Sequence, residues 1–177
     1  AWWPYLEDGV EAIVSTASGC GAQLREYGAL LEDDPAYAAK ASRIAALTRD
    51  VSEVLASERE SLLGLLQQST ARAGQRVAYH PPCTLQHAQK INGLAESLLV
   101  AAGHRLLPVA DTHLCCGSAG TYSILQPTLA DQLRDNKLAA LLVGEPSVLA
   151  TANVGCQTHL QSGSALPVRH WIELIDE

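Results

Sequence analysis

The predicted fold follows from one stretch of the sequence, Arg76-Val-Ala-Tyr-His-Pro-Pro-Cys83. Its first part, Arg76 to Tyr79, is typical of a short buried strand, and a cysteine follows the strand closely. The same order of strand and cysteine recurs three times: Glu11–Thr16 before Cys20, His104–Val109 before Cys115 and Cys116, and Ser147–Ala152 before Cys156.

Helical segments separate these strands. The predicted helical segments are Ala22–Leu31, two helices between Pro35 and Gln68, Leu85–Ala102, and Gln126–Leu142. The tail from His170 to Ile175 fits a short helix or a strand equally well. Strands that alternate with helices of this length predict an α/β fold with a largely parallel sheet covered by helices.

The carboxyl ends of parallel strands meet at one edge of a sheet, where ligands bind. We therefore expect the thiols of Cys83, Cys115, Cys116 and Cys156 to share one site there, with Cys20 on the same side. The adjacent pair Cys115-Cys116 can reach neighbouring iron atoms, and Gly117 after it allows close approach to inorganic sulfide. The pattern favours an iron–sulfur or other metal site.

Three alternatives stay open at this point. Free cysteine is among the most buried residue types, so any one of these thiols could be a core residue. The thiols could bind zinc, although a single zinc ion more simply uses spaced pairs of Cys and His. A redox disulfide between Cys115 and Cys116 is the minor alternative, because a ring closed by adjacent residues is strained.

Histidines accompany the cysteines. His159 lies three residues after Cys156, so it is either a metal ligand or a residue that supports the ligands. We expect His80 and His113 to donate hydrogen bonds to thiolate sulfur rather than to bind metal. The other three histidines, His87, His104 and His170, are interpreted as surface or capping groups.

Charge and composition exclude several classes of function. The chain has 12 basic and 19 acidic residues, a formal charge of −7, which gives no long-range attraction to nucleic acid or anionic lipid. No apolar run approaches the roughly 20 residues of a membrane helix. No glycine-rich phosphate loop or Ser-His-Asp order is present. We expect a cytoplasmic chain that reaches the inner membrane only through partner subunits, and the start at Ala1 without any Met indicates a fragment or an edited chain.

The order Cys83, Cys115-Cys116-Gly117, Cys156 resembles the CCG cysteine-rich domain of heterodisulfide reductases, lactate-utilisation proteins and glycolate oxidase iron–sulfur subunits. Four stretches are similar to the glycolate oxidase subunits in particular: His80-Pro-Pro-Cys-Thr-Leu-Gln-His, His113-Leu-Cys-Cys-Gly-Ser-Ala-Gly-Thr-Tyr, Gly155-Cys-Gln-Thr-His-Leu-Gln-Ser-Gly and Pro167-Val-Arg-His-Trp-Ile-Glu-Leu. The resemblance runs from Trp2 to Asp176 and is to the C-terminal part of those subunits.

This resemblance implies an iron–sulfur cluster of the 4Fe–4S type, bound by Cys83, Cys115, Cys116 and Cys156, with His159 and Cys20 as further metal ligands. It also implies an electron-transfer subunit, not catalytic by itself, that takes electrons from flavin-containing subunits oxidising glycolate to glyoxylate. Residues 1–34 would end a first repeat, 35–72 would form a helical linker, and 73–177 would form a second repeat. The alternatives are a zinc-binding or metal-free assembly domain, or a site that reduces a disulfide or a quinone.

Two departures from the family pattern are visible. Many CCG domains end in Cys-x-x-Cys, whereas this chain has Cys156-Gln-Thr-His159. The closely spaced cysteine runs of the family's ferredoxin-like region are absent from these 177 residues.

Overall fold

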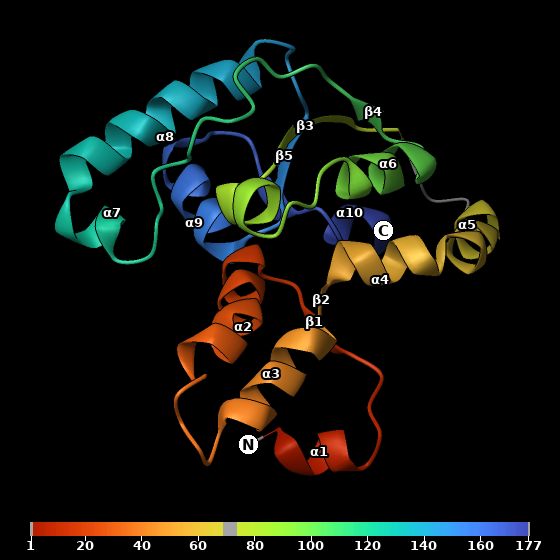
Figure 1. Ribbon diagram of the computed structural model, residues 1–177. Helices are drawn as coiled ribbons and strands as arrows, with labels where there is room; N and C mark the ends of the chain where they lie inside the picture. The colour runs from red at the N-terminus through yellow and green to blue at the C-terminus, as the bar shows by residue number, and fades with distance from the viewer. Residues whose placement is uncertain (1, 69–73, 177) are drawn as a thin grey trace.

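The computed structural model describes residues 2–68 and 74–176. A four-stranded parallel sheet lies at its centre, in the order β4 (Arg105–Leu106), β3 (Arg76–His80), β5 (Val148–Thr151), β6 (Val168–His170) (Figure 1). Helices cover both faces of this sheet, so the predicted α/β class with parallel strands is confirmed.

The two faces of the sheet have different layers of helices. Val77, Tyr79 and Ala150 pack against α4 (Val51–Ser57), α6 (Leu94–Ala101) and α10 (Glu173–Asp176), around the fully buried Trp171. Ala78 and Leu149 pack against α8 (Pro127–Leu142) and α9 (Val154–Gly163). Because both faces are covered, β5 is buried at every position.

The N-terminal segments form a smaller unit at the bottom of Figure 1, below the sheet. It contains α1 (Trp3–Glu7), β1 (Ile13–Ser15), α2 (Ser18–Leu30), α3 (Ala38–Leu47) and β2 (Thr48–Asp50), and β1 pairs with β2 in parallel. None of the helices in residues 2–68 and 74–176 is long and apolar enough to cross a bilayer.

The structure has three helices between Pro35 and Gln68, where the sequence predicted two. Residues 48–50 form strand β2, because Asp50 and Glu53 make a capping box that starts α4 as a new helix. Helix α5 (Arg59–Gln68) follows. The sequence pattern missed β2 because a three-residue strand gives too short a signal against the flanking helices.

Four other segments differ from the prediction. The helix expected over 85–102 is a π-helix, η1 (Thr84–Ala88), then a turn with Gly93 at φ 77°, then α6. The strand expected over 104–109 is limited to Arg105 and Leu106. The tail contains both β6 and α10, and helix α7 (Tyr122–Leu125) precedes α8.

Hydrogen bonds fasten the start of α2 to the carboxyl edge of the large sheet. The amide of Ser18 donates to the carbonyl oxygen of Ala152 at 3.1 Å, and the side-chain amide of Gln89 donates to the carbonyl oxygen of Ser18 at 2.9 Å. His170 Nε2 lies 2.7 Å from the carbonyl oxygen of Thr16. The first turn of α2 is therefore held at the edge where the cysteines lie.

Candidate metal centre

The five cysteines line one cavity of about 290 Å³ at the carboxyl edge of the sheet. The cavity wall also contains small and polar residues, namely Gly19, Thr84, Ser118, Ala119, Gly120, Asn153 and Gly155. A water molecule occupies roughly 30 Å³ in the liquid, so the space fits a group of several atoms. All five cysteines are free thiols.

Each cysteine reaches the cavity from a different segment. Cys83 immediately precedes η1, and the pair Cys115-Cys116 lies in the loop between β4 and α7. Cys156 is the third residue of α9, and Cys20 is the third residue of α2. Cys116 and Cys156 are buried, Cys83 and Cys115 are half-buried, and Cys20 is exposed.

Four of the thiols affect the ionisation of their neighbours in a row: Cys83 and Cys115, Cys115 and Cys116, and Cys116 and Cys156. Bonds from Cys116 and Cys83 lower the pKa of Cys115 to about 2, and the bond from Cys116 lowers the pKa of Cys156 to about 5. In return, the bonds to Cys115 raise the pKa of Cys83 and of Cys116 well above the ordinary 9.0. Each thiolate depends on a protonated neighbour, so all four can ionise together only if a cation joins them.

Backbone and side-chain amides point at two of the sulfur atoms. The amide of Gly117 donates to Cys115 Sγ at 3.3 Å, and Asn153 Nδ2 donates to Cys156 Sγ at 3.5 Å. Such bonds favour the thiolate form. Gly117 has φ 89°, and a Cβ atom there would lie 2.4 Å from the carbonyl oxygen of Ala130. The loop can therefore take this course only with glycine at position 117.

A histidine lies beneath the buried thiols. His80 ends β3, its side chain is 1% exposed, and apart from the Cys156 thiol neither ring nitrogen has a hydrogen-bond partner among the described residues. Its ligand nitrogen and the Sγ atoms of Cys116 and Cys156 all lie within 4.8 Å of one another. These three residues have the spacing of a metal site.

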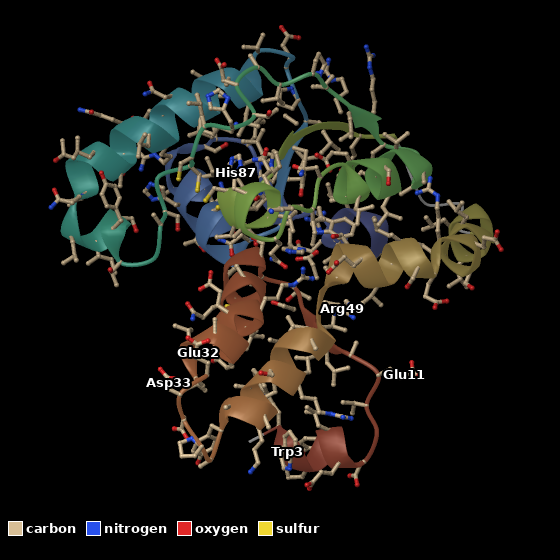
Figure 2. All side chains as sticks on the ribbon, viewed as in Figure 1. Trp3, Glu11, Glu32, Asp33, Arg49 and His87 are labelled. Atoms are coloured by element: carbon tan, nitrogen blue, oxygen red, sulfur yellow. The ribbon has the colours of Figure 1, made fainter. Side chains whose placement is uncertain are left out.

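The other histidines lie elsewhere. His159 Nε2 is 3.1 Å from the carbonyl oxygen of Ala130, and His159 lines a neighbouring hollow of about 410 Å³, which shares Ser118 and Gly155 with the cysteine cavity. His113 is exposed, and so is His87, which Figure 2 labels near the sheet edge. The structure therefore brings the five cysteines together but does not place His159 in their cavity.

Lys137 of α8 is a buried cation beside the cysteine loop. Its side chain is 0% exposed, and its Nζ donates to the carbonyl oxygens of Asp111 and Thr112 at 3.0 and 3.3 Å. Burial lowers the pKa of Lys137, whereas the attraction of Asp111, Cys116 and Cys115 opposes that shift. A positive charge here both holds the loop and favours negative charge on the thiols.

Comparison with known proteins identifies the domain. Residues 77–161, which contain the four joined cysteines, match the family model of the CCG cysteine-rich domain. This part of the chain is similar to the CCG cysteine-rich domain.

Several curated proteins are similar to this chain. The glycolate oxidase iron–sulfur subunit of Escherichia coli K12 is 51% identical over 177 residues, which is 100% of this chain and 42% of that protein. The probable glycolate oxidase iron–sulfur subunit of Bacillus subtilis 168 is 32% identical over 87% of this chain and 34% of its own length. Lactate utilization protein A of Geobacillus kaustophilus is 26% identical over 93% of this chain and 69% of its own length. The chain thus spans less than half the length of the two glycolate oxidase subunits that it matches.

The residues of the CCG cavity fit an iron–sulfur group by their chemistry. Four thiols in mutual contact supply the anionic sulfur ligands that iron prefers, and their ionisation needs a cation. Amide donors from Gly117 and Asn153 already point at two sulfurs. The buried nitrogens of His80, which have no hydrogen-bond partner other than the Cys156 thiol among the described residues, could bind a metal ion in the cavity.

Sequence reasoning missed Lys137 and Asn153. Lys137 lies on the face of α8 that also carries Ala130, Leu138 and Leu141, and a lysine among buried helical positions is a signal that the sequence contains. Asn153 precedes the first residue of α9, where an amide side chain can turn toward the third residue, Cys156. No sequence signal distinguished His80 from His113, because both precede a cysteine closely.

Proposed function

We propose that this CCG domain binds an iron–sulfur cluster in the five-cysteine cavity and carries electrons within a glycolate-oxidising enzyme complex. The convergence of five cysteines on one cavity of about 290 Å³ is the observation that carries the proposal. The similarity to proteins named glycolate oxidase iron–sulfur subunit supplies the process.

Cys83, Cys115, Cys116 and Cys156 would hold the cluster, which is of the 4Fe–4S type in this proposal, and Cys20 would contribute a fifth thiol at the edge. Bound there, the cluster supplies one-electron redox chemistry. The chain's own residues set its electrostatics. The Gly117 and Asn153 amides and the buried ammonium of Lys137 all favour added negative charge, which favours the reduced state.

The electrons would come from flavin-containing subunits that oxidise glycolate to glyoxylate. The domain would then act as a relay in the cytoplasm, contacting the inner membrane only through partner subunits. Residues 1–34 and 73–177 would correspond to two CCG repeats joined by residues 35–72. The formal charge of −7 supports a protein partner rather than nucleic acid or anionic lipid.

Zinc is the second candidate ligand of the cavity. The group of His80, Cys116 and Cys156 within 4.8 Å favours it, because zinc binds Cys and His in sites of this size. A zinc site would make the domain structural, since zinc has no redox chemistry in proteins.

Stopped-flow reduction tests the electron-transfer role. The cluster-loaded protein is mixed anaerobically with a flavin-containing glycolate oxidase subunit, and visible absorbance of the cluster is followed after glycolate is added. The proposal expects cluster bleaching that requires both glycolate and the flavin subunit. Bleaching that is absent while a chemical reductant still reduces the cluster would contradict the proposed partner.

A further inference from the structure

We infer that His80 is the non-cysteine ligand of this centre, with one ring nitrogen binding the metal ion that Cys116 and Cys156 hold. The inference rests on the proposed function in that it assumes a metal in the cavity. It adds which residue completes the ligand set, and it assigns that role to His80 rather than to His159.

The fold brings His80 to the thiols from below. His80 is the last residue of β3 and pairs in register with Thr151 of β5, at the carboxyl edge of the sheet. Side chains alternate along a strand, so His80 shares a face with Ala78, the face that α8 and α9 cover. Cys116 and Cys156 belong to that same buried layer.

The surroundings of His80 give its nitrogens few partners. The layer around it contains apolar side chains, among them Ala78, Leu149 and Leu160, which are fully buried. Both ring nitrogens are inaccessible, and apart from the Cys156 thiol neither has a hydrogen-bond partner among the described residues. A buried imidazole in such a layer is destabilising unless something binds it. The sulfurs of Cys116 and Cys156 lie within 4.8 Å of its ligand nitrogen, so a metal ion that binds His80 would lie among these three atoms.

His159 is already engaged. Its Nε2 lies 3.1 Å from the carbonyl oxygen of Ala130, and the same nitrogen is 3.1 Å from where a Cβ atom of residue 117 would be. The ring therefore packs behind Gly117 on the outer side of the cysteine loop. His159 supports the loop from a hollow that no cysteine lines, although Ser118 and Gly155 line both this hollow and the cysteine cavity.

Cobalt binding tests this assignment without requiring a loaded cluster. Metal-free protein is titrated anaerobically with Co²⁺ alone, and thiolate-to-cobalt charge transfer and the ligand-field bands are recorded. His80→Ala should weaken Co²⁺ binding at least about tenfold and shift the ligand-field bands, as expected for loss of one ligand. The matched control, His159→Ala, should stay within about twofold of the wild type. Equal Co²⁺ affinity and spectra for the wild type and His80→Ala would overturn the inference.

A second variant and a spectroscopic measurement also test the ligand role of His80. His80→Cys offers another ligand at the same position, so it should retain Co²⁺ binding even if His80→Ala folds poorly. In the wild type, protein with ¹⁵N-labelled histidine should show a histidine nitrogen coupled to the reduced iron–sulfur centre by pulsed EPR, and absence of that coupling counts against the ligand role. Wild-type protein that binds Co²⁺ through His80 but never takes up iron and sulfide would refute the proposed function and leave the His80 assignment intact.

Discussion

Cys20 and Cys156 are each the third residue of a helix that follows a parallel strand, and both thiols line the same cavity. The strand–helix segments β1–α2 and β5–α9 are offset by a constant number of residues. Helix α2 begins at Ser18 and α9 at Val154, a difference of 136, which is also the difference between the two cysteines. The hydrogen bond from the Ser18 amide to Ala152 joins the two segments. The cavity is thus built where two similar strand–helix units meet.

The thiols of this cavity should differ in accessibility. In metal-free protein treated with iodoacetamide at neutral pH, Cys20 and Cys115 should react at least about tenfold faster than Cys116 and Cys156, because Cys20 is exposed and Cys115 is a half-buried thiolate. Mass spectrometry of peptides from a time course measures the order. Fast labelling of Cys116 would show that the cavity is open in solution.

Gly117 should be far less replaceable than Gly120. Both have positive φ, but a Cβ atom at Gly117 would lie 2.4 Å from the Ala130 carbonyl oxygen, whereas Gly120 has nothing within 4 Å. We expect Gly117→Ala to lower the free energy of unfolding by more than about 2 kcal/mol and Gly120→Ala by about 1 kcal/mol, the cost of left-handed backbone alone. Urea denaturation of metal-free protein measures both. Equal losses would mean that the loop moves away from α8 at little cost.

The sequence predicted the convergence of the cysteines better than the details around them. Each of these thiols follows a strand, and parallel strands end at one edge, so Cys83 and Cys156 could be expected together from order alone. Strand β2 could not be expected from the sequence, because its three residues form a strand only by pairing with β1. The different settings of His80 and His159 also depend on packing. The His80 ring enters the layer under the sheet edge, whereas the His159 ring contacts the Ala130 carbonyl oxygen. The spacing of each histidine from a cysteine carries no information about this packing.

Lys137→Met should lower the midpoint potential of the bound cluster. Reduction adds negative charge, and removal of a buried ammonium beside Cys115 and Cys116 makes that addition less favourable. The variant should also lose about 1–3 kcal/mol of stability, since the Asp111 and Thr112 carbonyls lose their donor.

A redox titration followed by EPR measures that potential. Lys90→Met is the matched control, because Lys90 is exposed and its substitution should leave the potential unchanged. An unaltered potential in Lys137→Met would show that the lysine only supports the loop.

His170 should make the metal-free protein less stable in mild acid. Burial lowers its pKa below the ordinary 6.5, although the bond to Thr16 and the charges of Glu173 and Asp50 oppose this. In the neutral ring Nε2 donates to the Thr16 carbonyl while Nδ1 accepts from the Ile172 amide. The unfolded chain therefore binds the proton more readily, so stability falls as pH drops through 6.5.

Urea midpoints at pH values about one unit above and one unit below the ordinary histidine pKa test this effect. The decrease should be smaller in His170→Gln, which can still donate to Thr16 but does not titrate. His113→Gln, at an exposed position, should behave as the wild type does. An identical decrease in all three proteins would assign the acid sensitivity to other groups.

Iron and acid-labile sulfide analysis of anaerobically purified protein, with a visible spectrum, tests the central claim most directly. Protein with the proposed 4Fe–4S cluster should contain iron and sulfide in equal amounts, about four of each per chain, and should show thiolate-to-iron absorption in the visible. Cys116→Ser should lose both while its far-UV circular dichroism stays unchanged, because the α/β core does not depend on one ligand. Zinc in place of iron, or iron without sulfide, or a Cys116→Ser variant that keeps its full cluster, would contradict the account.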